Sequence, residues 1–411
     1  MPKPTHVRPA DVRGASRLVI DATLGITDLV ETMHSTILHA PEILGAPVNL
    51  PTGGITGLVY MSIRTITALV GGVIDVAFLP LLPLLRDRIS SPQRDATLAA
   101  INGVLGDHLR TSNNPLEIRM CMRIDGQPVE LTGPALAAAA PQASGKILLL
   151  AHGLCLTDQH WDQEGHDHGA LLAAELGYTP VYLHYNTGLH ISSNGRELAD
   201  MLAALTQAWP VPVEDLVIVA HSMGGLVARS ACHYGTLAGH AWLQHLRTLI
   251  FLGTPHHGSK LERAGNWLDT TLLISPYTAA FARVGQIRSA GITDLRYGNL
   301  LDEDWENRDR FTHVGDPRQP VPLPAGVSCY GVAATTGSIE GDLQDELPGD
   351  GLVPVDSALG AHPDPSMDLT LHEEWVGYDM NHMDLLHRRD VYAQIKQWLG
   401  GVGAADPCAS S

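Results

Sequence analysis

The feature that most constrains the fold is Ser222, which stands between an apolar run and a glycine pair. Leu216–Val219 are apolar and mostly β-branched, as in a strand that is buried on both faces. Apolar residues at 226–228 fit the start of a packed helix. Ala220 and Gly224 flank the serine at two residues on either side, and small residues are needed where strand and helix backbones pass close to a turn. The order predicts a strand, a sharp turn that exposes one serine hydroxyl, and a helix whose N-terminus points at it.

The pattern around Ser222 is G-x-S-x-G with Ala220 in the first place. The alternative is an ordinary Ser-Gly turn that caps a helix. The strand before the serine and the helix after it favour the catalytic interpretation.

Length and charge limit the classes of protein to consider. A chain of 411 residues predicts one large domain with additions, or two domains, and 45% apolar residues are ample for a core. The formal net charge of −18 argues against nucleic acid as a partner, because phosphate binding needs a basic surface. It also argues, more weakly, against binding to anionic membranes.

The cysteines and the N-terminus bear on the compartment. The five cysteines are scattered, odd in number and without C-x-x-C spacing, which indicates free thiols in a reducing compartment. Residues 1–5 lack a basic region followed by an uninterrupted apolar run, so no secretory signal is expected. We expect a cytoplasmic protein, with membrane association left open; a trimmed secreted chain is the alternative.

Residues 1–115 form an expected N-terminal helical region. Helical spacing of apolar residues predicts helices over 18–38 and 55–79, and residues 93–110 are expected to form another helix. Charges and prolines interrupt the second, which leaves no run long enough to span a bilayer. Two interpretations stay open for the first two helices: packing against the rest of the chain, or a peripheral contact with lipid or with another copy.

From 116 to 400 the pattern is that of an α/β domain. Asp125-Gly126 joins two short alternating segments into an expected hairpin. Buried strands and helices then alternate, which implies a mostly parallel sheet with helices on both faces. The expected strands are 146–151, 180–185, 216–220, 249–252, 327–333 and 368–377, and the expected helices are 167–176, 194–208, 223 onward and 389–399. The tail at 401–411 is expected to be flexible.

A serine nucleophile needs a base and an acid that orients it, in the order Ser, Asp, His in this topology. His382 follows the last strand and precedes the last helix, so its loop can reach back over the sheet edge. His387 lies further along, and His256 and His257 precede the acid.

Asp350 is the expected acid. Glycines on both sides permit a tight turn that aims its carboxylate inward. Asp356 is the rival, although capping the next short helix together with Ser357 suits it better. Asp345 and Glu346 are read as solvated charges.

Two backbone N–H groups should stabilise the oxyanion of the tetrahedral intermediate. Met223 directly follows the nucleophile at a helix N-terminus, and the second donor should lie in the loop after the strand at 146–151. Leu154 is the first choice there and Cys155 the second. Cys155 could also be proposed as a nucleophile, but a small buried thiol fits better.

These motifs together resemble the α/β-hydrolase esterases and lipases, closest to bacterial lipases and the glycosylphosphatidylinositol inositol-deacylase-like branch. They are Ala-His-Ser-Met-Gly-Gly at 220–225, His-Gly-Leu at 152–154, Gly-Thr-Pro-His-His-Gly at 253–258, Gly-Asp-Gly-Leu-Val at 349–353 and Asn-His at 381–382. The resemblance covers roughly 116–400 and implies an α/β-hydrolase fold. It also implies that the long segment 260–323 is a cap or lid, with a surface elaboration as the alternative.

Two other stretches attract attention. Histidines and carboxylates at 160–168 could hold a metal ion, but their spacing fits no closed site, and Asp167 suits a helix cap better. Residues 185–190 follow a strand and either line the site edge or form a structural turn. We therefore expect neither a metal nor a cofactor.

The sequence predicts a serine carboxylic-ester hydrolase with catalytic Ser222, Asp350 and His382 and an oxyanion hole of Leu154 and Met223. Its partner would be an ester with an acyl or lipid-like part. The alternatives are an acyltransferase or thioesterase on the same residues, and a non-catalytic scaffold or lipid-surface protein.

Overall fold

The computed structural model describes residues 10–21, 24, 61, 65, 92–163, 165–258, 289–308, 316, 318–339 and 349–401. Most of the helices expected over 18–38 and 55–79, most of the expected cap and the tail from 402 lie outside these residues. The chain divides into two compact units, residues 1–94 with 109–117 and residues 95–108 with 118–411. The domain limits at 115 and 400 stay predictions.

In the first unit a helix at 10–21 contacts the residues around 94 and 109–117. Arg94 forms a two-pronged ion pair with Asp11, with N–O distances of 2.7 and 2.6 Å. The Asn114 amide donates to the carbonyl of Gly14 at 3.1 Å. These contacts hold the described parts of this unit together.

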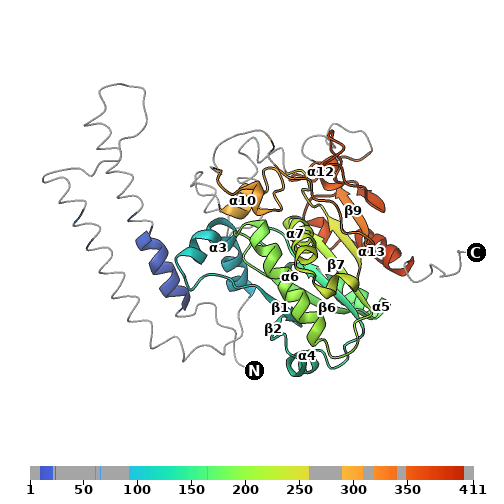
Figure 1. The fold of residues 1–411 in the computed structure, drawn as a ribbon, viewed down its shortest axis with the longest axis horizontal. Coiled ribbons are helices and arrows are strands. Elements are labelled where there is room, and N and C mark those ends of the chain that lie inside the picture. Colours follow the sequence, from blue (N-terminus) through green and yellow to red (C-terminus); the bar gives the residue numbers. More distant parts are fainter. Residues whose placement is uncertain are drawn as a thin grey trace, which may run out of the picture. The chain divides into compact units, whose positions relative to one another are not determined.

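The second unit is built on an eight-stranded sheet in the order β10-β9-β8-β7-β3-β6-β1-β2 (Figure 1). The six strands β10, β9, β8, β7, β3 and β6 run parallel to one another, and β1 is antiparallel to its neighbours β6 and β2. The strands are β1 Cys121–Ile124, β2 Gln127–Val129, β3 Lys146–Ala151, β6 Thr179–His184, β7 Asp215–His221, β8 Leu246–Leu252, β9 Ser328–Ala334 and β10 Glu373–Gly377. A separate small pair joins β4 Asp162–Gln163 to β5 His166–Asp167.

Helices cover both faces of the sheet because the central strands are apolar at consecutive positions. Successive residues of β3 and β7 enter two different cores, as the alternation of side chains in a strand requires. One core contains apolar residues of α6 Ile191–Ala208 and α7 Met223–Ala238, and the other contains those of α5 His168–Leu176 and α13 Arg389–Gly401. This is the α/β-hydrolase fold that the sequence predicts.

The expected elements agree closely with those observed. The hairpin of β1 and β2 turns at Asp125 and Gly126, whose φ values of 50° and 70° suit a two-residue turn. The helix expected over 93–110 is α3 Pro92–Thr111. Further short elements are α4 Gly133–Ala139, α10 Ala290–Asp294, α12 Val355–Ala358, and 3-10 helices at Asp158–Trp161, Ala241–Gln244, Asp302–Asp304 and Asp384–Leu386.

Among the described residues, no helix has the length and apolar character that crossing a bilayer requires.

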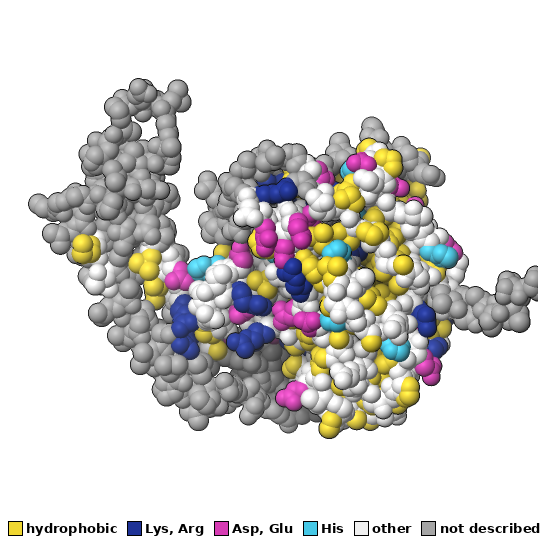
Figure 2. All heavy atoms as spheres, in the orientation of Figure 1, with side chains coloured by type: hydrophobic (Ala, Val, Ile, Leu, Met, Phe, Trp, Pro, Cys, Tyr) yellow, Lys and Arg dark blue, Asp and Glu magenta, His cyan; other side chains and the backbone are white. Residues whose placement is uncertain are grey.

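On the described part of the face in Figure 2, acidic side chains lie among the basic ones around α6 and α10. One such pair joins Arg196 of α6 to Asp302.

Candidate active site

Ser222 lies in a strained turn between β7 and α7. Its φ of 54° and ψ of −127° are unusual for a residue with a side chain and match a nucleophile that is lifted out of the sheet. The turn is held from both sides, since the Ser222 N–H donates to the Leu252 carbonyl at 2.8 Å and the Gly225 N–H donates to the Ser222 carbonyl at 3.0 Å. The expected strand, turn and helix are all present.

The glycines after Ser222 allow α7 to approach the neighbouring loops. A Cβ atom on Gly224 would lie 2.6 Å from the carbonyl oxygen of Ala151 and 2.8 Å from that of His152. One on Gly225 would lie 2.0 Å from the hydroxyl of Thr254. A larger residue would therefore displace backbone at position 224 and the Thr254 side chain at position 225.

Asp350 and His382 form a buried pair. His382 Nδ1 lies 2.6 Å from one carboxylate oxygen of Asp350, and the side chains are 5% and 0% exposed. The other carboxylate oxygen accepts the N–H groups of Leu352 and Val353 at 2.9 and 2.8 Å. The carboxylate is therefore aimed at Nδ1, which favours the tautomer that leaves Nε2 free to accept a proton.

The turn around Asp350 explains why it is the acid that reaches His382. Gly349 and Gly351 have φ values of 59° and 98°, a region that favours glycine, and the His382 N–H donates to the Asp350 carbonyl at 3.0 Å. The rival Asp356 lies in the first turn of α12, and the residue at the N-cap is Pro354 rather than a capping Asp356.

His382 lies at the end of the strand next to Ser222. A Cβ atom on Gly253, the residue after Leu252, would lie 3.1 Å from both Cε1 and Nδ1 of the His382 ring. His382 belongs to the loop after β10, but its ring packs against the end of β8, whose Leu252 carbonyl accepts the Ser222 N–H. The structure thus brings Ser222, Asp350 and His382 to one edge of the sheet, the edge where α/β proteins bind ligands.

A second histidine, His221, supports the loop of His382. Its Nε2 lies 3.1 Å from the His382 carbonyl, and the two rings are 4.6 Å apart between centroids. Burial lowers the pKa of His221 well below its ordinary value, so the ring is neutral and donates from Nε2 to that carbonyl. The sequence analysis missed this role, because nothing in the spacing of His221 links it to a segment 161 residues away.

The predicted oxyanion loop runs directly beside Ser222. A Cβ atom on Gly153 would lie 2.9 Å from Cβ and 3.4 Å from Oγ of Ser222. Leu154 and Cys155 occupy the corners of a turn closed by the Leu156 N–H and the Gly153 carbonyl at 3.3 Å.

The amide groups of this loop differ in their availability. The Cys155 N–H donates to the Thr187 hydroxyl at 3.1 Å. Within the described residues, the N–H groups of Leu154 and Met223 have no acceptor. The geometry therefore favours Leu154 over Cys155 as the partner of Met223.

Cys155 is a buried thiol in an unusual conformation. Its φ is 60°, which is uncommon for a non-glycine residue, and burial raises its thiol pKa to about 12. The thiol is therefore protonated and poorly nucleophilic at neutral pH. A Cβ atom on Gly103 of α3 would lie 2.2 Å from the Cys155 sulfur, so α3 packs closely against this loop.

His152 and Tyr185 form the support beneath the oxyanion loop. The Tyr185 hydroxyl donates to the His152 carbonyl at 2.8 Å, and the two rings stack at 4.6 Å. Burial lowers the pKa of His152 to about 3. A neutral ring stacked on tyrosine fixes the first residue of the loop.

The remaining candidate residues have structural roles. Asp167 caps α5 by accepting the N–H groups of Gly169 and Ala170 at 2.7 and 3.1 Å, as expected. Asn186 donates to the Gly106 carbonyl of α3 at 3.0 Å, so the 185–190 loop is a packed turn. Across the residues that the structure describes, no three His, Cys, Asp or Glu side chains are grouped to hold a metal ion.

The sheet order and the helices on both faces are those of the α/β-hydrolase fold, and Ser222, Asp350 and His382 lie at one edge of the sheet. A family model described as "Domain of unknown function (DUF7379)" matches residues 122–296, which is less than half of the chain. The matched region includes Ser222 but ends before Asp350 and His382. No curated protein matches the sequence.

Solved structures of lipases and esterases are similar in fold at low sequence identity. The mature form of the Bacillus licheniformis lipase BlEst2 is 19% identical, with a TM-score of 0.40 and coverage of 68% of this chain and 97% of that one. The Pyrococcus furiosus esterase Pf2001 is 13% identical, with a TM-score of 0.36 and coverage of 63% and 81%. A bacterial membrane phospholipase A is 14% identical, with a TM-score of 0.39 and coverage of 85% and 99%. Similarity of this degree carries no argument about activity.

Proposed function

We propose that the protein is a serine carboxylic-ester hydrolase. The observation that supports this most is the combination of Ser222 in its strained turn with the buried Asp350–His382 pair, whose imidazole packs against the end of the neighbouring strand β8. A buried carboxylate and imidazole joined at 2.6 Å, beside the turn that holds Ser222, suit proton transfer from the serine hydroxyl.

The mechanism follows from these positions. Ser222 Oγ attacks the ester carbonyl while His382 Nε2 takes its proton, and Asp350 stabilises the imidazolium through Nδ1–H. The N–H groups of Leu154 and Met223 stabilise the oxyanion. His382 then gives the proton to the leaving alcohol, and water repeats the sequence to release the acid. The reaction uses no cofactor.

The proposal extends to the substrate and to the parts outside the described residues. An ester with an acyl or lipid-like part is proposed from the motifs, and the segment 260–323 is proposed as the cap over it. The proposed peripheral contact of the N-terminal helices with lipid or with another copy concerns residues that lie mostly outside the described ranges.

The test is hydrolysis of p-nitrophenyl esters of graded acyl length by the wild type and by Ser222→Ala. We expect the wild type to release p-nitrophenol and the variant to lose at least 10³-fold of that rate, about the contribution of such a nucleophile. The profile across acyl lengths separates esterase from lipase behaviour.

A fluorophosphonate probe provides the matched control. It should label the wild type and not Ser222→Ala, while Cys155→Ala should be labelled like the wild type. A wild type that is inactive on every ester and unlabelled, or a variant that keeps its rate, would exclude the serine hydrolase. Labelling without hydrolysis would favour the acyltransferase or thioesterase alternative.

A further inference from the structure

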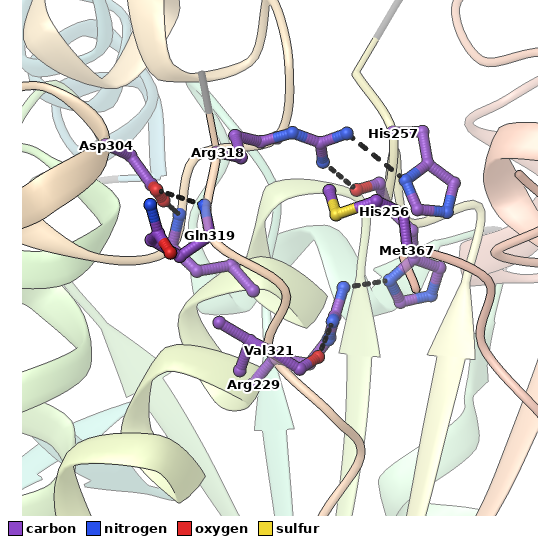
Figure 3. A pocket seen from close by; sticks show the side chains of 10 residues that line it. Arg229, His256, His257, Asp304, Arg318, Gln319, Val321 and Met367 are labelled. Atoms are coloured by element: carbon purple, nitrogen blue, oxygen red, sulfur yellow. Dashed lines mark hydrogen bonds between the residues drawn. The ribbon is translucent and has the colours of Figure 1, made fainter. Parts of the chain in front are cut away.

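A second polar cluster lies in the same unit, beside α7 at Arg229, and includes His256, His257, Asp304 and Arg318. It surrounds a cavity of about 10 Å³ (Figure 3). Figure 3 shows Arg318 and Arg229 reaching the cavity from opposite sides, with His256 and His257 on a third side. These side chains come from α7, from the loop after β8 and from the segment before β9.

Arg229 is buried without an anionic partner. It is 5% exposed, and no carboxylate of the described residues lies within ion-pair distance of it. Two of its five N–H groups are used, by the Val321 carbonyl at 2.6 Å and His256 Nδ1 at 3.2 Å. Its Nε has no partner within the part of the chain that the structure describes. An unpaired buried charge of this kind is strongly unfavourable, which indicates a missing anion.

The other charged groups around the cavity do not supply that anion. Arg318 is paired with Asp316 through N–O distances of 2.9 and 2.7 Å. Asp304 lines the cavity, but its oxygens accept the N–H groups of Leu300, Leu301 and Gln319 at 2.9 to 3.0 Å. Arg318 adds positive charge beside Arg229, and burial together with this repulsion lowers the pKa of Arg229 to about 9.

The two histidines beside the cavity are neutral, so they neither compensate the charge of Arg229 nor add to it. His256 accepts a hydrogen bond from Arg229 at Nδ1, which makes it the neutral tautomer with the proton on Nε2. Burial lowers the pKa of His257 to about 4, so it is also neutral near pH 7. Among the described residues around the cavity, no group therefore compensates the charge of Arg229.

We propose that the cavity binds a small monatomic anion, chloride, against the Arg229 guanidinium. A space of about 10 Å³ is near the lower limit for one water molecule, so among common anions a monatomic one comes closest to its size. A water molecule would fill the space and accept from Arg229 but would leave its charge uncompensated. Chloride does both.

This site is separate from the proposed esterase chemistry. Arg229 is seven residues after Ser222, which is roughly 10 Å along a helix. Between these two residues on α7, Gly225 packs closely against Thr254. We therefore expect chloride to act on stability, by binding the folded state alone, and not on the chemical step.

The experiment measures thermal unfolding of the full chain in sodium chloride, sodium bromide and sodium gluconate at equal ionic strength. Chloride and bromide should raise Tm by roughly 2–4 °C in a saturating manner, and gluconate should not. Arg229→Gln should abolish the difference between the salts, whereas Arg388→Gln, which removes an exposed arginine, should keep it.

Two measurements need no variant, in case Arg229→Gln does not fold. Crystals soaked in bromide should show an anomalous peak beside Arg229, and ³⁵Cl NMR lines should broaden with the wild type and sharpen on addition of bromide. Equal Tm in all salts, no bromide peak, or an Arg229→Gln variant that keeps the response would overturn the proposal. Stabilisation by sulfate or phosphate but not by halides would assign the cavity to an oxyanion and also overturn it.

Discussion

At the scale of the residue, two neighbouring positions on β7 and its turn divide the work of the site. Ser222 carries the hydroxyl, and His221 holds the carbonyl of His382 from below. The imidazole that would take the proton is thereby fixed by its side chain through Asp350 and by its backbone through His221.

Replacing His221 with phenylalanine tests this second anchor. His221→Phe keeps a ring of similar size but removes the donor to the His382 carbonyl, a hydrogen bond worth about 1 kcal/mol. We expect kcat for p-nitrophenyl esters to fall by about tenfold with little change in KM, and the rate against pH to shift, because only the placement of the base is altered.

The control for His221→Phe is His387→Phe, since His387 lies near His382 in sequence and its ring faces Asp384 at 3.9 Å. This variant should keep kcat. If His221→Phe changes only Tm and leaves kcat and the pH profile intact, its role is structural alone.

Much of the residue-level site could be predicted, for definite reasons. Ser222, Asp350 and His382 occur in the order that the topology requires. The place of His382 between the last strand and the last helix then distinguishes it from most of the other 20 histidines. The support from His221 could not be predicted, because it depends on a backbone carbonyl far away in the sequence. The unpaired charge of Arg229 could not be predicted either, because the sequence does not show which side chains surround it.

At the scale of the element, α3 connects the N-terminal part of the sequence to the site. Residues 95–108 of this helix belong to the unit that contains the sheet. Gly103 packs on Cys155, and the Ser289 hydroxyl donates to the Gly103 carbonyl at 2.6 Å. The sequence analysis expects this helix, but its close approach to Cys155 through Gly103 is visible only in the structure.

Substituting Gly103 tests the contact of α3 with the oxyanion loop. Gly103→Ala places a Cβ atom 2.2 Å from the Cys155 sulfur, so the loop or the helix must shift. We expect a loss of about 1–3 kcal/mol in the free energy of unfolding, measured in urea, and a reduced kcat on esters.

A double-mutant cycle with Cys155→Ala makes the test specific. Removing the sulfur relieves most of the overlap, so the combined variant should be more stable than the sum of the two changes predicts. Gly133→Ala is the control, since its Cβ would meet its nearest atom only at 3.9 Å. Additive losses in the cycle would show that Gly103 matters for another reason.

At the scale of the whole molecule, buried neutral histidines couple stability to pH. Burial lowers the pKa values of His152 and His168 to about 3 and that of His257 to about 4. In the unfolded chain these rings titrate near their ordinary value of about 6.5. Below that pH the unfolded state binds protons that the folded state does not.

The sign follows directly. The contribution of each histidine is complete above about pH 6.5 and is lost as the pH falls toward its folded pKa, at up to about 1.4 kcal/mol per pH unit for each ring. We expect the free energy of unfolding in urea to fall steeply between pH 6 and 4. His168→Gln should make that slope shallower, and His108→Gln, at an exposed position, should not. Equal slopes for the wild type and both variants would contradict the prediction.

The two outer strands of the sheet differ from the central ones in a way that concerns contacts between molecules. β2 is only three residues long and contains Pro128, which has no N–H to offer to an added strand. β10 begins with two exposed glutamates, Glu373 and Glu374. Short, proline-bearing and negatively charged borders oppose the pairing of one sheet with the next. Both borders of this sheet therefore resist the addition of a strand from another copy of the chain.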